Sequence, residues 1–273
     1  MSFAADLRYD LADRAQKYAT AQGLPHSLSY GSLPVACFAP HEDGLRHGNF
    51  LPESYKTIQV NPAWKKRLAK VHTQGHRCLP ETGRGRWMEL DACTSSDALL
   101  MNIFCNPSAL RSRKLSILLA AEPQAHASFG YKARVPLLSG RFDRTEIDLR
   151  LGNLLIEAKL TESDFQTARK EILLGYRDFR NVFDLHQLPQ STTHYFSYQL
   201  LRNVLAAYAL ECSFCVLIDA RRPDLKVAWY AVMMCVKPVE LRTRLRIATW
   251  QEVAQAVPPK LQTFLALKYG IET

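Results

Sequence analysis

The sequence predicts an α/β fold, and three observations lead to this prediction. Gly152-Asn153 is a two-residue turn between apolar-alternating segments, which is typical of a β-hairpin. Segments with helical spacing of apolar residues are expected before and after this hairpin. With 273 residues and a hydrophobic content of 47%, the chain can bury one substantial core with a smaller appended lobe.

The first third of the chain is expected to be a basic region of helices and loops. Residues 4–22 are predicted to form an amphipathic helix, and residues 24–60, rich in Pro, Gly and His, loops with short strands. Residues 61–72 are predicted to form a short basic helix. We expect this region, residues 1–86, to pack on a core that spans residues 87–273.

The core is expected to follow the order helix, three strands, helix, strand. Ser95 is a suitable N-cap for a helix that runs to about Phe104. Strands are predicted at 128–138, 145–151 and 154–160. A capping box of Ser163 and Gln166 predicts a helix that ends near Phe183. A helix at 193–211, strands at 213–220 and 226–237, and a C-terminal helical region broken at Pro258-Pro259 complete the prediction.

The turn also sets the register of the hairpin. If Leu151 lies opposite Leu154, then Asp148 lies opposite Glu157, and Glu146 lies opposite Lys159. Because side chains alternate across a strand, one face is expected to belong to the core. That face carries Ile147, Leu149, Leu151, Leu154, Ile156 and Ala158, and the other carries Glu146, Asp148, Arg150, Leu155, Glu157 and Lys159.

The opposed carboxylates of Asp148 and Glu157 suggest a metal site. Directly opposite residues have Cβ atoms about 5 Å apart, so the two acids repel each other unless a cation lies between them. Mg²⁺ uses oxygen ligands and often only one or two protein carboxylates, so we expect Mg²⁺ here, with Mn²⁺ as a substitute. A metal-free alternative is also open: Glu146, Lys159 and Arg150 could neutralise the acids as cross-strand ion pairs.

Asp148, eight intervening residues and Glu157-Ala158-Lys159 resemble the PD-(D/E)XK signature of the restriction-endonuclease-like nuclease superfamily. Ile147 stands where the signature has Pro. Fainter resemblance covers most of the chain and points to a bacterial branch assigned as restriction endonucleases; it is carried by Ser95-Ser96-Asp97-Ala98-Leu99-Leu100, by Gln199-x-x-Arg202 and by CVLIDARRPD at 215–224. The resemblance implies a core of a mixed β-sheet flanked by helices in α-β-β-β-α-β order, with an N-terminal basic extension.

The resemblance also implies roles for individual residues. Asp148 and Glu157 would hold the metal, helped by the Ala158 carbonyl, and Lys159 would act beside the attacking water. Glu89 is expected as an additional metal ligand, with Asp97 as its rival. Gln199, Arg202 and Glu146 are expected either to support the metal ligands or to contact the substrate.

The charge distribution suggests a nucleic-acid partner. The net charge is +9, and residues 56–86 carry eight Lys or Arg residues against one acid, Glu81. The expected phosphate contacts are Lys65, Lys66, Arg67, Lys70, Arg84 and Arg86; a solvated basic face is the alternative. Arg242, Arg244 and Arg246 would form a second basic row if that stretch is extended. DNA is the expected partner, and RNA and a homodimer are left open.

Other classes of protein are disfavoured. No apolar run approaches the roughly 20 residues of a membrane span, so a cytoplasmic protein without membrane contact is expected. Seven irregularly spaced cysteines favour reduced thiols over a disulfide framework. His72, His76 and Cys78 with Cys212 and Cys215 suggest zinc only weakly, because the last two lie in a strand-like run. A glycosidase would need no lysine in this position.

The sequence therefore predicts a Mg²⁺-dependent nuclease that hydrolyses phosphodiester bonds of DNA, of the restriction or defence type. The leading alternative is a catalytically silent nucleic-acid-binding protein of the same fold, which would bind DNA equally with chelator and with Mg²⁺. An interaction scaffold would show no salt-dependent DNA binding at all.

Overall fold

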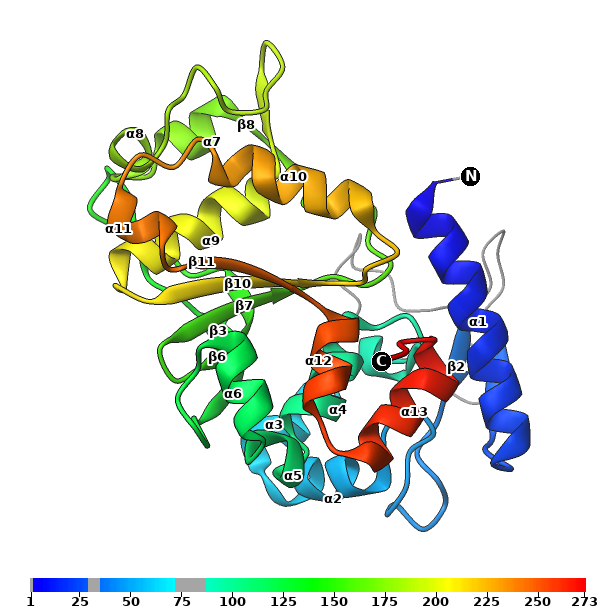
Figure 1. The fold of residues 1–273 in the computed structure, drawn as a ribbon. Helices are drawn as coiled ribbons and strands as arrows, with labels where there is room; N and C mark the ends of the chain where they lie inside the picture. The colour runs from blue at the N-terminus through cyan, green and yellow to red at the C-terminus, as the bar shows by residue number, and fades with distance from the viewer. Residues whose placement is uncertain (1, 29–34, 72–86) are drawn as a thin grey trace. The chain divides into compact units, whose positions relative to one another are not determined.

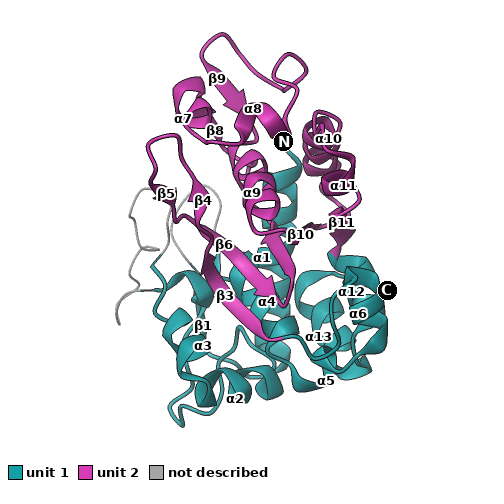
Figure 2. Ribbon diagram, turned by 90° about the vertical axis from the view of Figure 1, so that its left-hand side faces the viewer, with its two compact units in different colours: residues 1–125, 250–273 teal, residues 126–249 magenta. Residues whose placement is uncertain are grey.

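The structure is a computed structural model that describes residues 2–28, 35–71 and 87–273 (Figure 1). The chain divides into two compact units (Figure 2). Unit 1 contains residues 1–125 and 250–273, and unit 2 contains residues 126–249. The expected boundary at residue 86 ends a segment, 72–86, that lies outside the described residues, so this boundary stays a prediction.

Unit 1 is mainly helical. Its elements are α1 (Phe3–Ala21), β1 (His26–Leu28), β2 (Ala36–Phe38), α2 (Pro52–Val60), α3 (Pro62–Arg67), the 3₁₀ helix η2 (Glu89–Asp91), α4 (Ser96–Phe104), α5 (Pro107–Leu110), α6 (Arg113–Leu119), α12 (Trp250–Ala256) and α13 (Pro259–Tyr269). The predicted N-terminal helix, the helix that begins after Ser95 and the break at Pro258-Pro259 are confirmed. Helix α2 was not predicted, since the residues around it suggested loop.

Side chains of the expected capping type begin several of these helices. The hydroxyl of Ser2 accepts from the Ala5 amide at α1, and Asn61 accepts from the amides of Ala63 and Trp64 at α3. Ser95 accepts from the Ala98 amide at 3.1 Å and begins α4. Helix α4 is buried along its length from Asp97 to Phe104, so it forms the centre of unit 1.

Unit 2 is built around a five-stranded sheet. Its elements are β3 (Ala127–Lys132), β4 (Val135–Pro136), β5 (Phe142–Asp143), β6 (Glu146–Leu151), β7 (Leu154–Ala158), β8 (Thr167–Arg169), α7 (Lys170–Leu174), α8 (Phe179–Val182), β9 (His194–Phe196), α9 (Tyr198–Ala209), β10 (Ser213–Ile218), α10 (Pro223–Met233), α11 (Val239–Arg242) and β11 (Leu245–Thr249). The strand order is β11-β10-β7-β6-β3. Strand β10 is parallel to β7 and β11, whereas β6 is antiparallel to β7 and β3. The predicted mixed sheet flanked by helices, with a restriction-endonuclease-like core, is confirmed.

The register of the β6–β7 hairpin is confirmed near the turn, whereas the predicted pairs of Asp148 with Glu157 and of Glu146 with Lys159 lie beyond the last backbone pair. Leu151 pairs with Leu154, Arg150 with Leu155, and Leu149 with Ile156. Within the turn only Gly152 has a positive φ, at +58°. A positive φ at the first central residue is what a glycine supplies at low cost in two-residue hairpin turns.

Helices α9 and α10 cover one face of this sheet (Figure 1). Leu200, Leu201, Val204 and Leu205 of α9 are buried in the same hydrophobic cluster as Phe214, Val216 and Ile218 of β10. Trp229 of α10 meets Phe214 edge to face, with 5.6 Å between ring centroids. Aromatic and branched side chains thus fix the helix that borders the predicted site.

Three predictions about unit 2 are wrong. No single helix spans 163–183, because Gln166 adopts φ +60° and the chain continues as β8 before α7 and α8. The predicted strand at 226–237 is α10 instead, since Pro223 begins a helix whose buried Leu225, Trp229 and Val232 follow helical spacing. The second basic row fails because Arg242 ends α11 while Arg246 lies in β11.

Candidate active site

The predicted catalytic residues lie where β6 begins and β7 ends, beside the parallel strand β10. Val216 of β10 pairs with Glu157, and Leu217 pairs with Ala158. The Lys159 amide continues this ladder by donating to the Leu217 carbonyl at 2.8 Å. The segment that carries Glu157 and Lys159 is therefore held by backbone bonds on the β10 side.

Asp148 lies at an interruption of the β-ladder. Its Oδ2 accepts a hydrogen bond from the Ala158 amide at 2.8 Å, beyond the last backbone pair of β6 and β7. On the other side, Gly130 of β3 takes φ +62° where the register would pair it with Asp148. Ile147 and Leu155, expected on opposite faces, consequently share one hydrophobic cluster. The predicted separation of the two faces therefore fails beyond Asp148.

Glu157 is the centre of a buried hydrogen-bonded group. Its Oε1 accepts from Lys159 Nζ at 2.7 Å, and its Oε2 accepts from Asn203 Nδ2 at 2.7 Å. The exposed fraction is 2% for Glu157, 5% for Lys159 and 0% for Asn203. The opposite orientation of the Asn203 amide would place two oxygens against each other, so the donor is assigned to Nδ2.

Several acids keep Lys159 protonated. Burial lowers the pKa of the Lys159 ammonium, but the nearby carboxylates of Glu157, Glu162 and Asp148 outweigh burial and raise this pKa above its ordinary value. The ammonium also lies 5.8 Å from the centre of the Phe165 ring. Lys159 is thus a fixed positive charge rather than a proton acceptor at neutral pH.

Helix α9 places two of the other predicted residues beside the hairpin. Arg202 is buried and donates to the backbone carbonyls of Thr145 at 2.9 Å and Glu146 at 2.7 Å. The Lys159 ion pair expected with Glu146 is formed with Glu157 instead, and Glu146 is exposed. Gln199 lies one turn before Asn203, and its Oε1 is buried without a hydrogen-bond partner among the described residues. Their roles toward substrate stay predictions.

Glu89 and Asp97 belong to unit 1, where both contact Lys70. Lys70 Nζ lies 2.8 Å from Glu89 and 2.6 Å from Asp97, and Arg67 lies 2.7 Å from Asp97. Burial opposes ionisation of both acids; it raises the pKa of Glu89, while the two cations lower the pKa of Asp97. This ion-pair group is a structural feature of unit 1, and metal binding by Glu89 or Asp97 stays a prediction.

The predicted phosphate contacts have different surroundings. Lys65 and Lys66 are exposed at the end of α3, whereas Arg67 and Lys70 form the ion pairs just described. Arg84 and Arg86 lie outside the described residues, as do His72, His76 and Cys78. Cys212 and Cys215 are both buried thiols.

Two buried polar residues of the site were missed from the sequence. Asn203 is one, and it sits inside the apolar pattern of α9, so no local signal marks it. Arg222 is the other: its guanidinium donates to the carbonyls of Leu160, Glu162 and Ser163 at 2.8–3.1 Å and pairs with Asp224. Arg222 therefore holds the loop that follows Lys159. Its place in CVLIDARRPD was a signal, but only of family resemblance.

The oxygen ligands around Glu157 fit a hard divalent cation. Asp148 and Glu157 offer carboxylate oxygens, which Mg²⁺ and Mn²⁺ prefer. Asn203 Oδ1, beside Glu157, is buried without a hydrogen-bond partner among the described residues, so an acceptor remains for a water or an ion-bound water. In the described part of the chain, no three side chains of His, Cys, Asp or Glu gather at one point. A cation would thus rely on two carboxylates completed by water or substrate.

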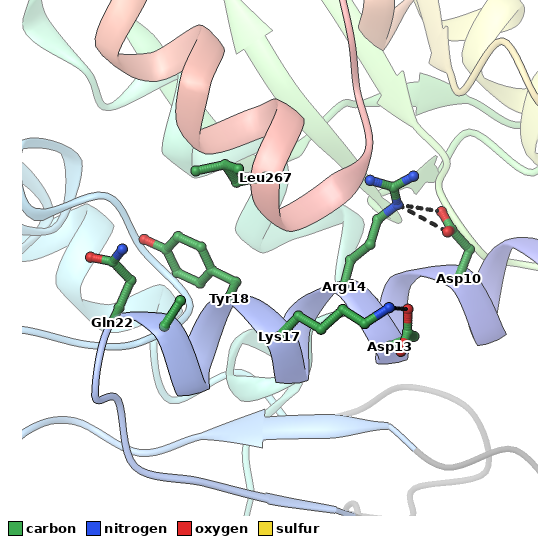
Figure 3. A pocket seen from close by; sticks show the side chains of 8 residues that line it. Asp10, Asp13, Arg14, Lys17, Tyr18, Gln22 and Leu267 are labelled. Atoms are coloured by element: carbon green, nitrogen blue, oxygen red, sulfur yellow. Dashed lines mark hydrogen bonds and ion pairs between the residues drawn. The ribbon is translucent and has the colours of Figure 1, made fainter.

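A pocket in unit 1 does not include these residues. A pocket of about 410 Å³ lies between α1 and α13 of unit 1 (Figure 3). Its charged residues pair with each other along α1, Arg14 with Asp10 and Lys17 with Asp13.

No helix among the residues that the structure describes is long and apolar enough to cross a bilayer.

Comparison with protein families identifies the chain. Residues 15–270 match the family described as restriction endonuclease associating with ARP, or REase-ARP. Comparisons with curated proteins and with solved structures give no match. The matched range contains β6, β7 and α9, and with them the group around Glu157. The chain therefore belongs to the REase-ARP family of restriction endonucleases.

Proposed function

We propose that this protein is a Mg²⁺-dependent endonuclease that hydrolyses phosphodiester bonds of DNA, with Asp148, Glu157 and Lys159 as its catalytic residues. One observation carries the proposal: a buried carboxylate, Glu157, is bonded to a charged lysine at 2.7 Å, and Asp148 is bonded to the backbone between them at 2.8 Å. Membership of a restriction endonuclease family supports the same reaction.

In this proposal Asp148 and Glu157 hold the cation. A bound Mg²⁺ would polarise the phosphoryl oxygens and make hydroxide available near neutral pH. Mn²⁺ is expected to replace it, because both ions prefer oxygen ligands. Glu157 keeps lone pairs beyond its two hydrogen bonds. It can therefore bind the cation while its ion pair with Lys159 persists.

The residues of the chain supply orientation and charge. Lys159, held protonated by its acidic neighbours, would stabilise the negative charge that develops on the phosphate and orient the attacking water. The hydrogen bond from Asn203 orients the Glu157 carboxylate. Arg202 fixes the start of β6 by donating to the carbonyls of Thr145 and Glu146. A preorganised group of this kind reduces the reorganisation needed during reaction.

The proposed biological role is restriction of foreign DNA. The family description names ARP as an associated component, so activity on DNA could require that partner in addition to a divalent cation. Cleavage of both strands could also require two copies of the chain, because one catalytic group cuts one strand at a time.

The test is incubation of the purified chain with supercoiled plasmid and with single-stranded DNA in Mg²⁺, Mn²⁺ or EDTA. Cation-dependent cleavage is expected, and Asp148→Ala and Lys159→Ala should lose it. Glu240→Ala is the matched control, because Glu240 is exposed at α11, away from the catalytic group. Nicked circles would indicate single-strand cleavage, and linear plasmid would indicate paired cuts. Equal cleavage by wild type and Asp148→Ala would reject the proposal.

A second candidate function is DNA binding without cleavage. It is favoured by the closed state of the group: both oxygens of Glu157 already have protein donors, and Lys159 is 5% exposed. A silent binder should retain DNA equally in EDTA and Mg²⁺, and Asp148→Ala should leave retention unchanged. Divalent binding that depends on Asp148 would count against this candidate.

A further inference from the structure

A basic hairpin leads directly into the strand that carries Asp148. Strands β4 and β5 pair Val135 with Asp143 and Pro136 with Phe142, which is the same register that pairs β3 with β6. The two strand pairs therefore form one long ribbon, and residues 132–146 are its outer part. In Figure 2 the β4–β5 end of this ribbon extends beyond β3 and β6.

The outer part of this ribbon is strongly cationic. Four exposed cations lie on residues 132–144, and none has a carboxylate partner among the residues that the structure describes; they are Lys132, Arg134, Arg141 and Arg144. The single acid of this segment, Asp143, turns its carboxylate to the hydroxyls of Thr145 and Tyr176, at 2.5 and 2.6 Å. Glu146, the register partner of Lys132, is an exposed acid at the base, so residues 132–146 expose four cations against one acid and carry a net positive charge.

Apolar side chains accompany the cations. Phe142 is 40% exposed, and the Arg134 guanidinium lies 4.3 Å from the centre of its ring. Leu138, at the tip, is 68% exposed. An arginine stacked on an exposed aromatic ring is typical of surfaces that bind nucleic acids, because the pair offers both charge and a flat face.

The protein holds this hairpin in place. The Leu138 amide donates to the Gly175 carbonyl at 2.9 Å, and the Arg177 amide donates to the Pro136 carbonyl at 3.0 Å. Ala133 and Val135 are buried on the inner side. At the base, Arg202 bonds the carbonyls of Thr145 and Glu146, and the next residue of α9, Asn203, bonds Glu157. The cations thus belong to a supported surface, and α9 connects it to the catalytic group.

We infer that the hairpin of residues 132–144, the basic hairpin, binds the phosphate backbone of duplex DNA and places it at Asp148. This inference rests on the proposed function, which makes DNA the substrate. Arg144 precedes Asp148 by four residues, about 13 Å of extended strand. Since a DNA strand rises about 3.4 Å per nucleotide, a phosphate bound by Arg144 would lie roughly four nucleotides from the bond to be cut.

The test is DNA binding by the full chain as a function of salt, in EDTA so that cleavage does not interfere. The variant replaces Lys132, Arg134, Arg141 and Arg144 with Gln. Each lost phosphate contact should reduce the slope of log affinity against log salt by about 0.9 for duplex DNA. A matched control replaces four other exposed cations of unit 2, Arg180, Lys226, Arg242 and Arg246, which also lack carboxylate partners among the described residues. The control has the same net charge as the variant, and it should keep the wild-type slope.

A second measurement does not depend on removing charge. A photo-crosslinking residue at Leu138, 68% exposed, should crosslink to DNA, whereas the same residue at Val227, 69% exposed on α10, should not. Equal slopes for the variant and wild type, or equal loss in variant and control, would overturn the inference, as would crosslinking at both sites. Failure of the proposed function would look different: DNA would bind through the basic hairpin but stay uncut in Mg²⁺ and Mn²⁺.

Discussion

Asn203 and Glu157 are joined by a 2.7 Å hydrogen bond between two almost completely buried side chains. The bond connects α9, which also fixes the base of the basic hairpin, to the carboxylate at the centre of the catalytic group. Helix α9 therefore contributes to the hydrophobic core of unit 2 and supports both the proposed catalytic group and the proposed DNA-binding hairpin.

Replacing Asn203 should test this connection. Asn203→Leu removes the donor and leaves one Glu157 oxygen buried without its partner, which should lower the free energy of unfolding by about 1–3 kcal/mol. Gln199→Leu is the matched control on the same helix, because Gln199 Oε1 has no hydrogen-bond partner among the described residues and should cost less to replace. Urea unfolding of both variants gives the comparison. An equal or greater loss for Gln199→Leu would mean that the bond to Glu157 stabilises nothing.

Lys159→Met should reduce cleavage by about 100-fold or more, because the fixed positive charge at the phosphate is lost. The pKa of Lys159 is raised above its ordinary 10.5, so its stabilising effect is fully present below 10.5 and disappears only as pH rises through the raised folded value. The stability difference between wild type and Lys159→Met should therefore be constant from about pH 6 to 9. Thermal unfolding across that range is the measurement, and a difference that shrinks toward pH 9 would contradict the assigned charge state.

Arg222→Met should destabilise the fold by about 3 kcal/mol or more, because three loop carbonyls and Asp224 lose their buried donor. Arg246→Met serves as the control, since Arg246 is exposed on β11. Urea unfolding measures both. We also expect Arg222→Met to weaken cleavage more than its stability loss explains, because the loop after Lys159 is released. A variant as stable as the control would show that the loop is held by other contacts.

Lys268 of α13 supplies a prediction about unit 1. Its ammonium is buried, bonds the Gly48 carbonyl and Asn49, and faces rings that include Phe38 at 4.5 Å, with no carboxylate partner among the described residues. Burial lowers the pKa of Lys268 well below 10.5. The unfolded chain therefore binds the Lys268 proton more readily than the folded chain. The destabilisation caused by burying the ammonium is largest at low pH, and it declines as pH rises from the lowered pKa of the folded state to 10.5.

Lys268→Met should consequently stabilise the protein most at acidic pH, with a gain that shrinks as pH increases. Unfolding of wild type and variant at several pH values measures this gain. A gain that grows with pH, or a loss at every pH, would show that the aromatic rings and the two acceptors stabilise the ammonium more than burial penalises it.

The sequence predicted the parts of the fold that depend on local chemistry. The Gly152 turn and the alternation around it gave the correct register, and Ser95 and Pro258-Pro259 marked real helix ends. The errors occurred where the backbone departs from a local pattern. Gln166 at φ +60° ends a helical spacing that continues in the sequence, and Gly130 at φ +62° rotates the ribbon near Asp148. Positive φ values at these positions depend on tertiary contacts, which no local pattern records.

Only the site residues that lie in the β6–β7 hairpin and directly after it could be predicted from the sequence. Asp148, Glu157 and Lys159 are adjacent in one hairpin, so turn and alternation suffice to bring them together. Asn203 and Arg222 reach the same region from elements 46 and 60–62 residues away in sequence, and their effect comes from burial rather than from residue type. The basic hairpin was also missed, because its cations are spread over strands and a turn and become one surface only when the ribbon pairs.

Metal binding by Asp148 and Glu157 can be measured without DNA, as Mn²⁺ binding by wild type, Asp148→Ala, Glu157→Gln and Glu240→Ala, followed by the paramagnetic resonance signal of free Mn²⁺. It needs no DNA and no associated component. We expect a specific Mn²⁺ site in wild type and Glu240→Ala that is lost in Asp148→Ala and strongly weakened in Glu157→Gln. Equal Mn²⁺ binding by all four proteins would contradict the assignment of Asp148 and Glu157 as the metal ligands of a nuclease.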